Sequence, residues 1–131
     1  MRDPEELVLH ALERLRTIEG FDRVRFIILF GSVAEERARE TSDLDLCLFY
    51  DDSSEKAGQF RLRALSLLCD DRYDIQIFLN LPLYVRMEVL KGRVVYCPDE
   101  QFLYDVAPDT IREFDDYKHR LYDYPGTEMI V

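Results

Sequence analysis

The sequence predicts an α/β domain in which helices pack on a small β-sheet. Short apolar runs rich in β-branched residues alternate with longer stretches whose apolar residues recur at helical spacing. VRFIILF (24–30) and DLDLCLFY (43–50) are typical of buried strands, whereas PEELVLHALERLRTI (4–18) is typical of an amphipathic helix. The chain has 131 residues and no internal repeat, so we expect a single domain.

The first predicted element is a helix over 4–18. Pro4 suits the first turn, Glu5 and Glu6 complement the positive end of the helix dipole, and Gly20 is expected to end the helix. The apolar positions of this helix are Leu7, Leu9, Leu12, Leu15 and Ile18.

The next predicted elements form a strand, turn and helix. A buried strand over 24–30 leads into a turn at Gly31-Ser32, and a run rich in Ala, Glu and Arg predicts a short helix over 33–40. A second strand over 43–50 follows this helix.

The middle of the chain continues the alternation. After a polar loop at 51–56, in which Ser53 or Ser54 is the expected N-cap, a broad apolar face predicts a helix over 55–71. YDIQIFL alternates with a period of two and predicts a third strand. We expect that strand at 73–79, a helix closed by Gly92 at 82–92 and a short strand at 93–97.

The last part of the chain is acidic and rich in tyrosine. A helix is expected over 108–124, with Pro108 at an early position. We therefore divide the chain into a main unit at 1–98 and a C-terminal extension at 99–131, which either belongs to the same domain or binds a partner. Its tyrosines either pack on the sheet or form a partner-binding surface. They are Tyr104, Tyr117, Tyr122 and Tyr124.

The composition excludes several classes of function. The net charge of −10 would repel nucleic acid over most of the surface, so no direct nucleic-acid partner is expected. A metal-bound nucleotide or a basic protein remains compatible with this charge, and so does the alternative that the acidity only aids solubility. No apolar stretch approaches 18 residues, and the start is charged and amphipathic, so neither a membrane span nor a signal peptide is expected.

The three cysteines predict a reducing compartment. Cys47, Cys69 and Cys97 are widely spaced, form no CxxC pair and lie in or beside apolar runs. We expect buried free thiols and a cytoplasmic protein.

Two aspartates at the head of an apolar strand are the first candidate site. Side chains at i and i+2 share one face of a strand, so Asp43 and Asp45 lie together while the leucines between and after them face the core. Hard carboxylate oxygens suit Mg²⁺. The turn at Gly31-Ser32 precedes a helix N-terminus, where backbone N–H groups bind phosphate. Each motif taken alone also fits a plain turn or a solvated strand end.

A third aspartate opens the next predicted strand. Asp74 lies at the head of YDIQIF, on the face opposite to its isoleucines. If the two strands are neighbours, the carboxylates of Asp43, Asp45 and Asp74 lie close together. They would repel one another unless metal ions were bound between them. Such a cluster could hold two metal ions, neutralise a triphosphate and activate an attacking hydroxyl. On its own, Asp74 also fits an exposed strand end.

The combined pattern resembles a known family. Gly31-Ser32, ten intervening residues and Asp43-x-Asp45, within LFGSVA and SDLDL, resemble the GS-x10-DxD signature of the DNA polymerase beta-like nucleotidyltransferase superfamily. The short chain is similar to the minimal nucleotidyltransferases, in particular the antitoxin of MNT–HEPN toxin–antitoxin pairs. The resemblance covers roughly residues 5–97 and implies a nucleotidyltransferase fold with a small mixed β-sheet.

The resemblance also implies roles for individual residues. Gly31 and Ser32 would hold the nucleotide phosphates, and Asp43 and Asp45 would bind Mg²⁺, two ions in all. Asp74 would complete the metal site and act as the base. The reaction implied is transfer of AMP from ATP to a tyrosine of a HEPN toxin, an RNase that the modification silences.

One departure from the family pattern keeps a second hypothesis open. Many relatives carry a basic residue and a glycine after GSxA, where this chain has Glu35 and Glu36. Two acids near a triphosphate are unfavourable unless they turn outward or basic neighbours offset them. The alternatives are an antitoxin that acts by binding alone, with weak or no catalysis, and nucleotidyl transfer to a small molecule. A homo- or hetero-oligomer is compatible with each of these hypotheses.

Overall fold

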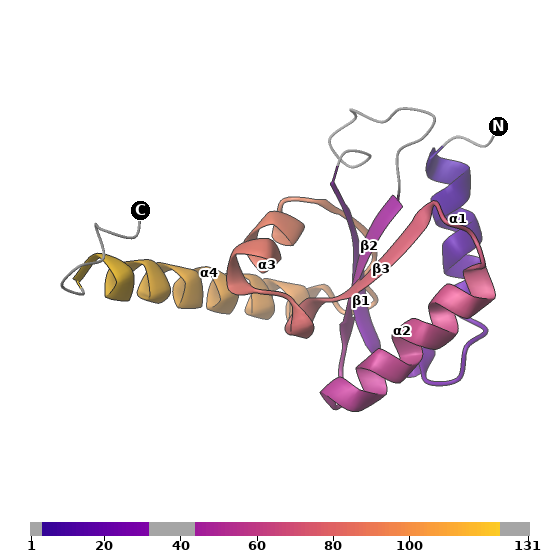
Figure 1. Cartoon of the computed structure of the whole chain (residues 1–131), viewed down its shortest axis with the longest axis horizontal. Coiled ribbons are helices and arrows are strands. Elements are labelled where there is room, and N and C mark those ends of the chain that lie inside the picture. The colour runs from indigo at the N-terminus through magenta and orange to yellow at the C-terminus, as the bar shows by residue number, and fades with distance from the viewer. Residues whose placement is uncertain (1–3, 32–43, 124–131) are drawn as a thin grey trace.

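The structure is a computed structural model of the chain, and it describes residues 4–31 and 44–123. Within these ranges, four strands form one sheet in the order β3-β2-β1-β4 (Figure 1). β1 is antiparallel to both β2 and β4, whereas β2 is parallel to β3. The strands are β1 (Val24–Phe30), β2 (Leu44–Tyr50), β3 (Tyr73–Ile77) and β4 (Arg93–Tyr96). The expected α/β class with a small mixed sheet is confirmed.

Helices cover both faces of the sheet (Figure 1). α1 (Pro4–Leu15) and α2 (Ser54–Leu68) pack on one face, and α3 (Leu83–Leu90) and the first half of α4 (Glu100–Asp123) lie on the other. Two 3₁₀ turns complete the described elements, η1 (Phe21–Arg23) and η2 (Phe78–Asn80). In the part of the chain that the structure describes, we find no helix with the length and apolarity needed to span a bilayer.

A separate apolar cluster lies on each face, and the period-2 alternation of β2 decides which side chains enter which cluster. The leucines of β2 join the cluster beneath α1 and α2, as expected, whereas Cys47 and Phe49 join the cluster beneath α3 and α4. Four aromatic rings from β1, β2, η2 and α4 fill the second cluster, with centroids 4.8 to 6.3 Å apart. They are Phe26, Phe49, Phe78 and Phe102.

The first helix is shorter than its periodicity predicts. α1 ends at Leu15 rather than at Ile18, because the chain then turns through Gly20 at φ 95°, a left-handed conformation that glycine adopts without strain. Leu9 is 59% exposed and does not join the core, although it fitted the apolar pattern.

The second helix ends three residues before the expected position 71. Cys69 takes a left-handed conformation at φ 45°, and its N–H donates to the Leu65 carbonyl at 3.0 Å, which closes the helix. All three cysteines are free in the structure, but only Cys47 is fully buried. Cys97 is half-buried and Cys69 is exposed, so the expectation of a buried thiol is wrong for Cys69.

The third strand also stops early. β3 ends at Ile77 instead of continuing to residue 79, because the chain turns through η2 to place the Phe78 ring in the second cluster. Leu79 is consequently 45% exposed. The predicted helix at 33–40 and the start of the strand at Asp43 lie outside the described residues.

The last helix begins earlier than predicted. α4 begins at Glu100 rather than near Pro108, which lies inside the helix. A proline in this position removes one backbone hydrogen bond and costs about 3 kcal/mol. Side chains of the preceding turns, Phe102, Leu103 and Val106, pack against the second cluster and offset that cost.

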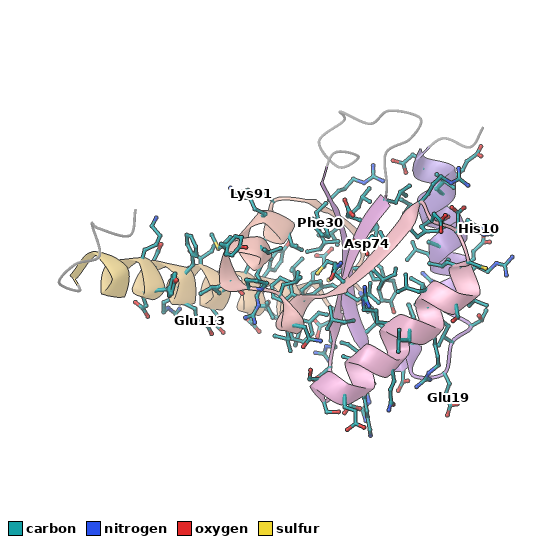
Figure 2. All side chains as sticks on the ribbon, viewed as in Figure 1. His10, Glu19, Phe30, Asp74, Lys91 and Glu113 are labelled. Carbon is teal, nitrogen blue, oxygen red and sulfur yellow. The ribbon has the colours of Figure 1, made fainter. Side chains whose placement is uncertain are left out.

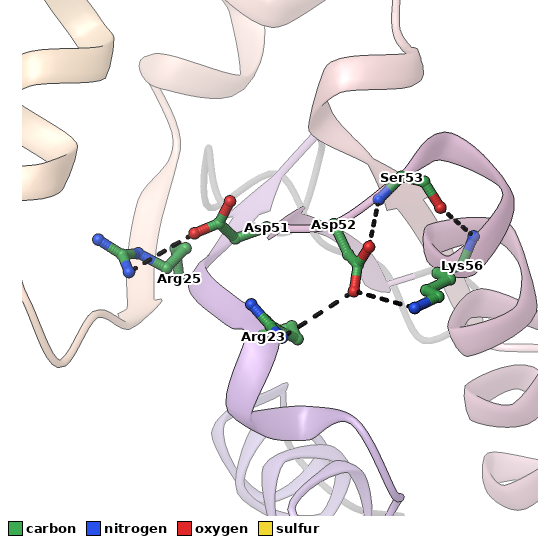
Figure 3. Close-up of polar contacts among 6 residues, drawn as sticks. All are labelled: Arg23, Arg25, Asp51, Asp52, Ser53 and Lys56. Atoms are coloured by element: carbon green, nitrogen blue, oxygen red, sulfur yellow. Dashed lines mark hydrogen bonds and ion pairs between the residues drawn. The ribbon is translucent and has the colours of Figure 1, made fainter.

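A polar network at the end of the sheet where β2 stops fixes the start of α2 (Figure 3). The Ser53 hydroxyl accepts a hydrogen bond from the Lys56 N–H at 3.2 Å, so Ser53 is the N-cap. The Asp52 carboxylate accepts from the Ser53 N–H at 2.7 Å and lies 3.9 Å from both the Arg23 and the Lys56 side chains. Beside this network, Arg25 and Asp51 form an ion pair at 3.6 Å.

We expect Ser53→Ala to lower the free energy of unfolding by about 1 kcal/mol, because the Lys56 N–H then loses its hydrogen-bond partner. Urea titration followed by circular dichroism measures this change. Ser54→Ala is the matched control, since Ser54 is the first residue of the helix and its hydroxyl donates to the Asn80 side chain at 3.1 Å. Equal losses in the two variants would contradict the assignment of Ser53 as the cap.

Candidate active site at the strand ends

The candidate site lies at the edge of the sheet where β1 ends and β2 and β3 begin (Figure 1). Because β2 and β3 are parallel, their starts meet at one edge, and β1 is antiparallel to β2, so its end meets them there. Gly31 follows β1 directly, while Asp45 and Asp74 are the second residues of β2 and β3. The topology thus gathers three of the five predicted site residues.

The two described aspartates are direct neighbours across the sheet. Asp45 of β2 pairs in register with Asp74 of β3. Neighbouring strands lie about 4.8 Å apart and registered residues point to the same face, so the two carboxylates share one face. Leu44 and Leu46 on either side of Asp45 belong to the cluster beneath α1 and α2, which places the aspartates on the α3 side. Both aspartates are half-buried, and Figure 2 shows Asp74 near the start of β3.

The Asp45 carboxylate lies against the backbone of Gly31. A Cβ atom built on Gly31 would be 2.5 Å from Asp45 Oδ2, closer than real Cβ contacts allow. Gly31 also has φ of 83°, which side-chain-bearing residues rarely adopt. Glycine is therefore required here for two reasons, its own backbone conformation and the close approach of the Asp45 carboxylate. The sequence suggested only a role in approaching phosphate.

A glutamine whose role the sequence pattern did not indicate holds the second aspartate. The Gln76 side-chain amide donates to Asp74 Oδ2 at 3.0 Å. The two residues are i and i+2 on β3, so they share the face. The spacing of these two residues is visible in YDIQIF. A glutamine on a half-buried strand face is common, however, so the sequence alone does not show that this one binds Asp74.

A turn before β3 positions both strand starts. The Asp70 carboxylate accepts from the Arg72 N–H at 2.9 Å and from the Arg72 guanidinium at 2.7 and 3.1 Å. The Arg72 carbonyl accepts from the Leu44 N–H at 2.6 Å, so this turn also fixes the residue before Asp45. Hydrogen bonds from Arg72 lower the pKa of Asp70 to about 2.

The lowered pKa of Asp70 predicts a pH-dependent contribution to stability. Since the folded-state pKa lies below the usual 3.8, the contribution is fully present above about pH 4 and is lost as the pH falls toward 2. We expect Asp70→Asn to be less stable than the wild type at pH 6, with the difference vanishing near pH 2. Urea unfolding of both proteins across this range measures the difference, and a constant difference would contradict the assignment.

A fixed cation lies over the same face. Arg86 of α3 donates to the carbonyls of Leu79 at 2.9 Å and Leu81 at 3.0 Å, which holds its guanidinium in place. Burial raises the pKa of the Cys47 thiol, and the Arg86 charge opposes this rise, so Arg86 acts electrostatically on the residue two positions after Asp45.

The donor set fits Mg²⁺. Asp45 and Asp74 offer carboxylate oxygens side by side, and Mg²⁺ is commonly held by one or two carboxylates together with substrate phosphates. Among residues 4–31 and 44–123, no group of three His, Cys, Asp or Glu side chains is arranged to hold a metal ion. Asp43, the predicted third ligand, lies outside the described residues, and so do Ser32, Glu35 and Glu36.

Known proteins resemble the chain in sequence. Residues 15–101 match the family described as "Polymerase beta, Nucleotidyltransferase". Over 76 residues the chain is 39% identical to a protein of Methanocaldococcus jannaschii described as "Putative protein adenylyltransferase". This match covers 56% of the chain and 56% of that protein, so the chain spans little more than half the length of this curated relative.

Solved structures share the fold. A chain from a crystal structure of a toxin-antitoxin with AMP-PNP superposes with a TM-score of 0.67 at 17% identity, covering 90% of this chain and 92% of that one. A chain from the complex of tri-AMPylated Shewanella oneidensis HEPN toxin with MNT antitoxin superposes with a TM-score of 0.65 at 16% identity, covering 88% and 90%. At such identities the likeness establishes the fold.

Proposed function

The chain belongs to the Polymerase beta nucleotidyltransferase family, and from this membership we propose that it is a Mg²⁺-dependent nucleotidyltransferase that transfers AMP from ATP to a protein hydroxyl. The acceptor is a tyrosine of a HEPN-type toxin, which makes the chain an antitoxin. The site comprises Gly31 and Ser32 for the nucleotide phosphates and Asp43, Asp45 and Asp74 for the metal.

The observation that carries this proposal is the pairing of Asp45 with Asp74 beside Gly31. Two carboxylates in register on parallel strands lie close enough together for one cation to contact both of them. The Gly31 backbone lies against one of them, so a phosphate approaching Gly31 would meet a cation held by Asp45. This supports metal-assisted phosphoryl chemistry at the strand ends.

The proposed reaction is a displacement at the α-phosphorus of ATP. The acceptor oxygen forms a bond to that phosphorus, the bond to the oxygen bridging the α- and β-phosphates breaks, and pyrophosphate leaves. Asp74 takes the proton of the acceptor hydroxyl, and the hydrogen bond from Gln76 fixes the orientation of that carboxylate. Mg²⁺ held by the aspartates, two ions by the family resemblance, would neutralise the triphosphate and the leaving group.

The choice of acceptor is supported by the similar proteins. The M. jannaschii relative is described as a protein adenylyltransferase, and solved structures of the same fold come from toxin-antitoxin complexes. One of these complexes contains a HEPN toxin that carries AMP groups.

Label transfer tests the proposal. The chain is incubated with Mg²⁺, α-phosphate-labelled ATP and the purified HEPN-type protein encoded in the same genome. We expect label on that protein, lost with Asp45→Asn but retained with Glu55→Gln, an exposed carboxylate at the other end of the sheet. If a stable complex forms without any label transfer, the antitoxin acts by binding alone, and the proposed transfer is wrong.

A further inference from the structure

The second half of α4 is apolar on one side but lies away from the rest of the fold. Figure 1 shows α4 extending past α3 and the sheet toward the C-terminus. Ile111 is 44% exposed and Tyr117 is 49% exposed, and Phe114 between them is half-buried. We call Ile111, Phe114 and Tyr117 the distal band. Phe114 and Tyr117 are three residues apart and lie on one side of the helix, and Ile111, three residues before Phe114, borders that side.

Phe114 and Tyr117 of the distal band continue the side of α4 that is buried in the first half of the helix, and Ile111 lies beside that side. Leu103 and Val106 pack into the second cluster, and Thr110 is 6% exposed. Phe114 and Tyr117 follow at steps of four and three residues, which keeps them on the same side. The sheet and α3 cover this side up to Thr110, and beyond it the same apolar pattern continues without an equivalent cover among the described residues.

The charge of α4 indicates what kind of molecule covers the band. Seven acidic and three basic residues lie between Glu100 and Asp123, and Glu113, Asp115 and Asp116 beside the band are exposed. A second copy of the chain also has a net charge of −10. Its acidic surface would therefore repel this helix. A partner with an apolar groove rimmed by Lys and Arg meets both requirements.

We infer that the distal band of α4 is the docking surface for the basic groove of the HEPN-type toxin that the chain modifies. This inference rests on the proposed function for the identity of the partner. The surface is separate from the strand ends that carry Asp45 and Asp74. Binding and AMP transfer therefore use different residues of the same chain.

Calorimetric titration against the purified HEPN-type protein of the same genome tests the inference. We expect Ile111→Ser/Tyr117→Ser to weaken binding at least tenfold, because both side chains lose apolar contact. Leu62→Ser/Leu67→Ser is the matched control, since these leucines of α2 are 63% and 36% exposed. Glu113→Lys/Asp116→Lys is expected to weaken binding as well and to reduce the dependence of affinity on salt. Circular dichroism confirms that all variants fold.

The outcomes separate this inference from the proposed function. Unchanged affinity of the distal-band variant, or an equal loss in the α2 control, would overturn the inference. Light scattering that shows a dimer dissociated by the distal-band substitutions would replace the toxin by a second copy as the occupant. The inference would also be overturned if the wild-type chain did not bind the HEPN-type protein. Binding through the band without AMP transfer would leave the inference standing and refute only the transfer.

Discussion

Asp74→Asn is expected to lower kcat for AMP transfer by about 10²–10⁴-fold, because the amide cannot take the proton of the acceptor hydroxyl and is a poorer metal ligand. Asparagine has nearly the same shape as aspartate, and its oxygen still accepts the hydrogen bond from Gln76, so the fold should be unchanged. Initial rates of label transfer at saturating Mg²⁺ and ATP measure the effect.

The control for this variant is Asp71→Asn, which removes an exposed carboxylate three residues earlier. It is expected to retain the wild-type rate. If Asp74→Asn transfers AMP as fast as the wild type, Asp74 is neither the base nor a metal ligand. Its pairing with Asp45 would then have no catalytic role.

Gly31→Ala is expected to reduce AMP transfer by at least about 10²-fold. The new methyl group would lie 2.5 Å from Asp45 Oδ2, so the Asp45 carboxylate must move, and a displacement of about 1 Å in a catalytic group can cost that factor. The left-handed backbone at φ 83° adds about 1 kcal/mol of strain to the folded state. Transfer rates and urea unfolding, measured on the same preparation, separate the two effects.

Gly58→Ala provides the matched control. Gly58 lies within α2, and a Cβ atom built there meets nothing within 4 Å. Alanine is the better helix former, so this variant should be more stable than the wild type by up to about 1 kcal/mol and fully active. A Gly31→Ala protein with the activity and stability of the wild type would show that the approach of Asp45 to Gly31 has no function.

The positions of the first strands and the faces of their side chains were readable from the sequence, because both depend on local patterns. The alternation of DLDLCLFY assigned the leucines and the aspartates of β2 to opposite faces, and the structure agrees for Leu44 and Asp45. Asp74 was placed at a strand head by the same pattern. That β2 and β3 are neighbours in register, however, is a tertiary property, and only the resemblance to a family implied that these carboxylates meet.

Features that depend on distant contacts could not be predicted. The start of α4 at Glu100 depends on Phe102 packing against rings that lie up to 76 residues away in the chain, as between Phe26 and Phe102, and Pro108 suggested a later start. The exposure of Leu9 depends on which side of α1 meets the sheet. The contact between Gly31 and Asp45 depends on the pairing of β1 with β2, in which Phe30 lies opposite Asp45, and this pairing is a tertiary property.

The central claim is that Asp45 and Asp74 together hold the metal of a bound nucleotide beside Gly31. A crystal structure of the chain with Mn²⁺ and AMP-PNP, with the metal located by its anomalous signal, tests it most directly. We predict a metal ion at about 2.1–2.2 Å from carboxylate oxygens of both aspartates, with nucleotide phosphates against the Gly31 backbone. A nucleotide bound elsewhere, or a metal that contacts neither aspartate, would contradict the account.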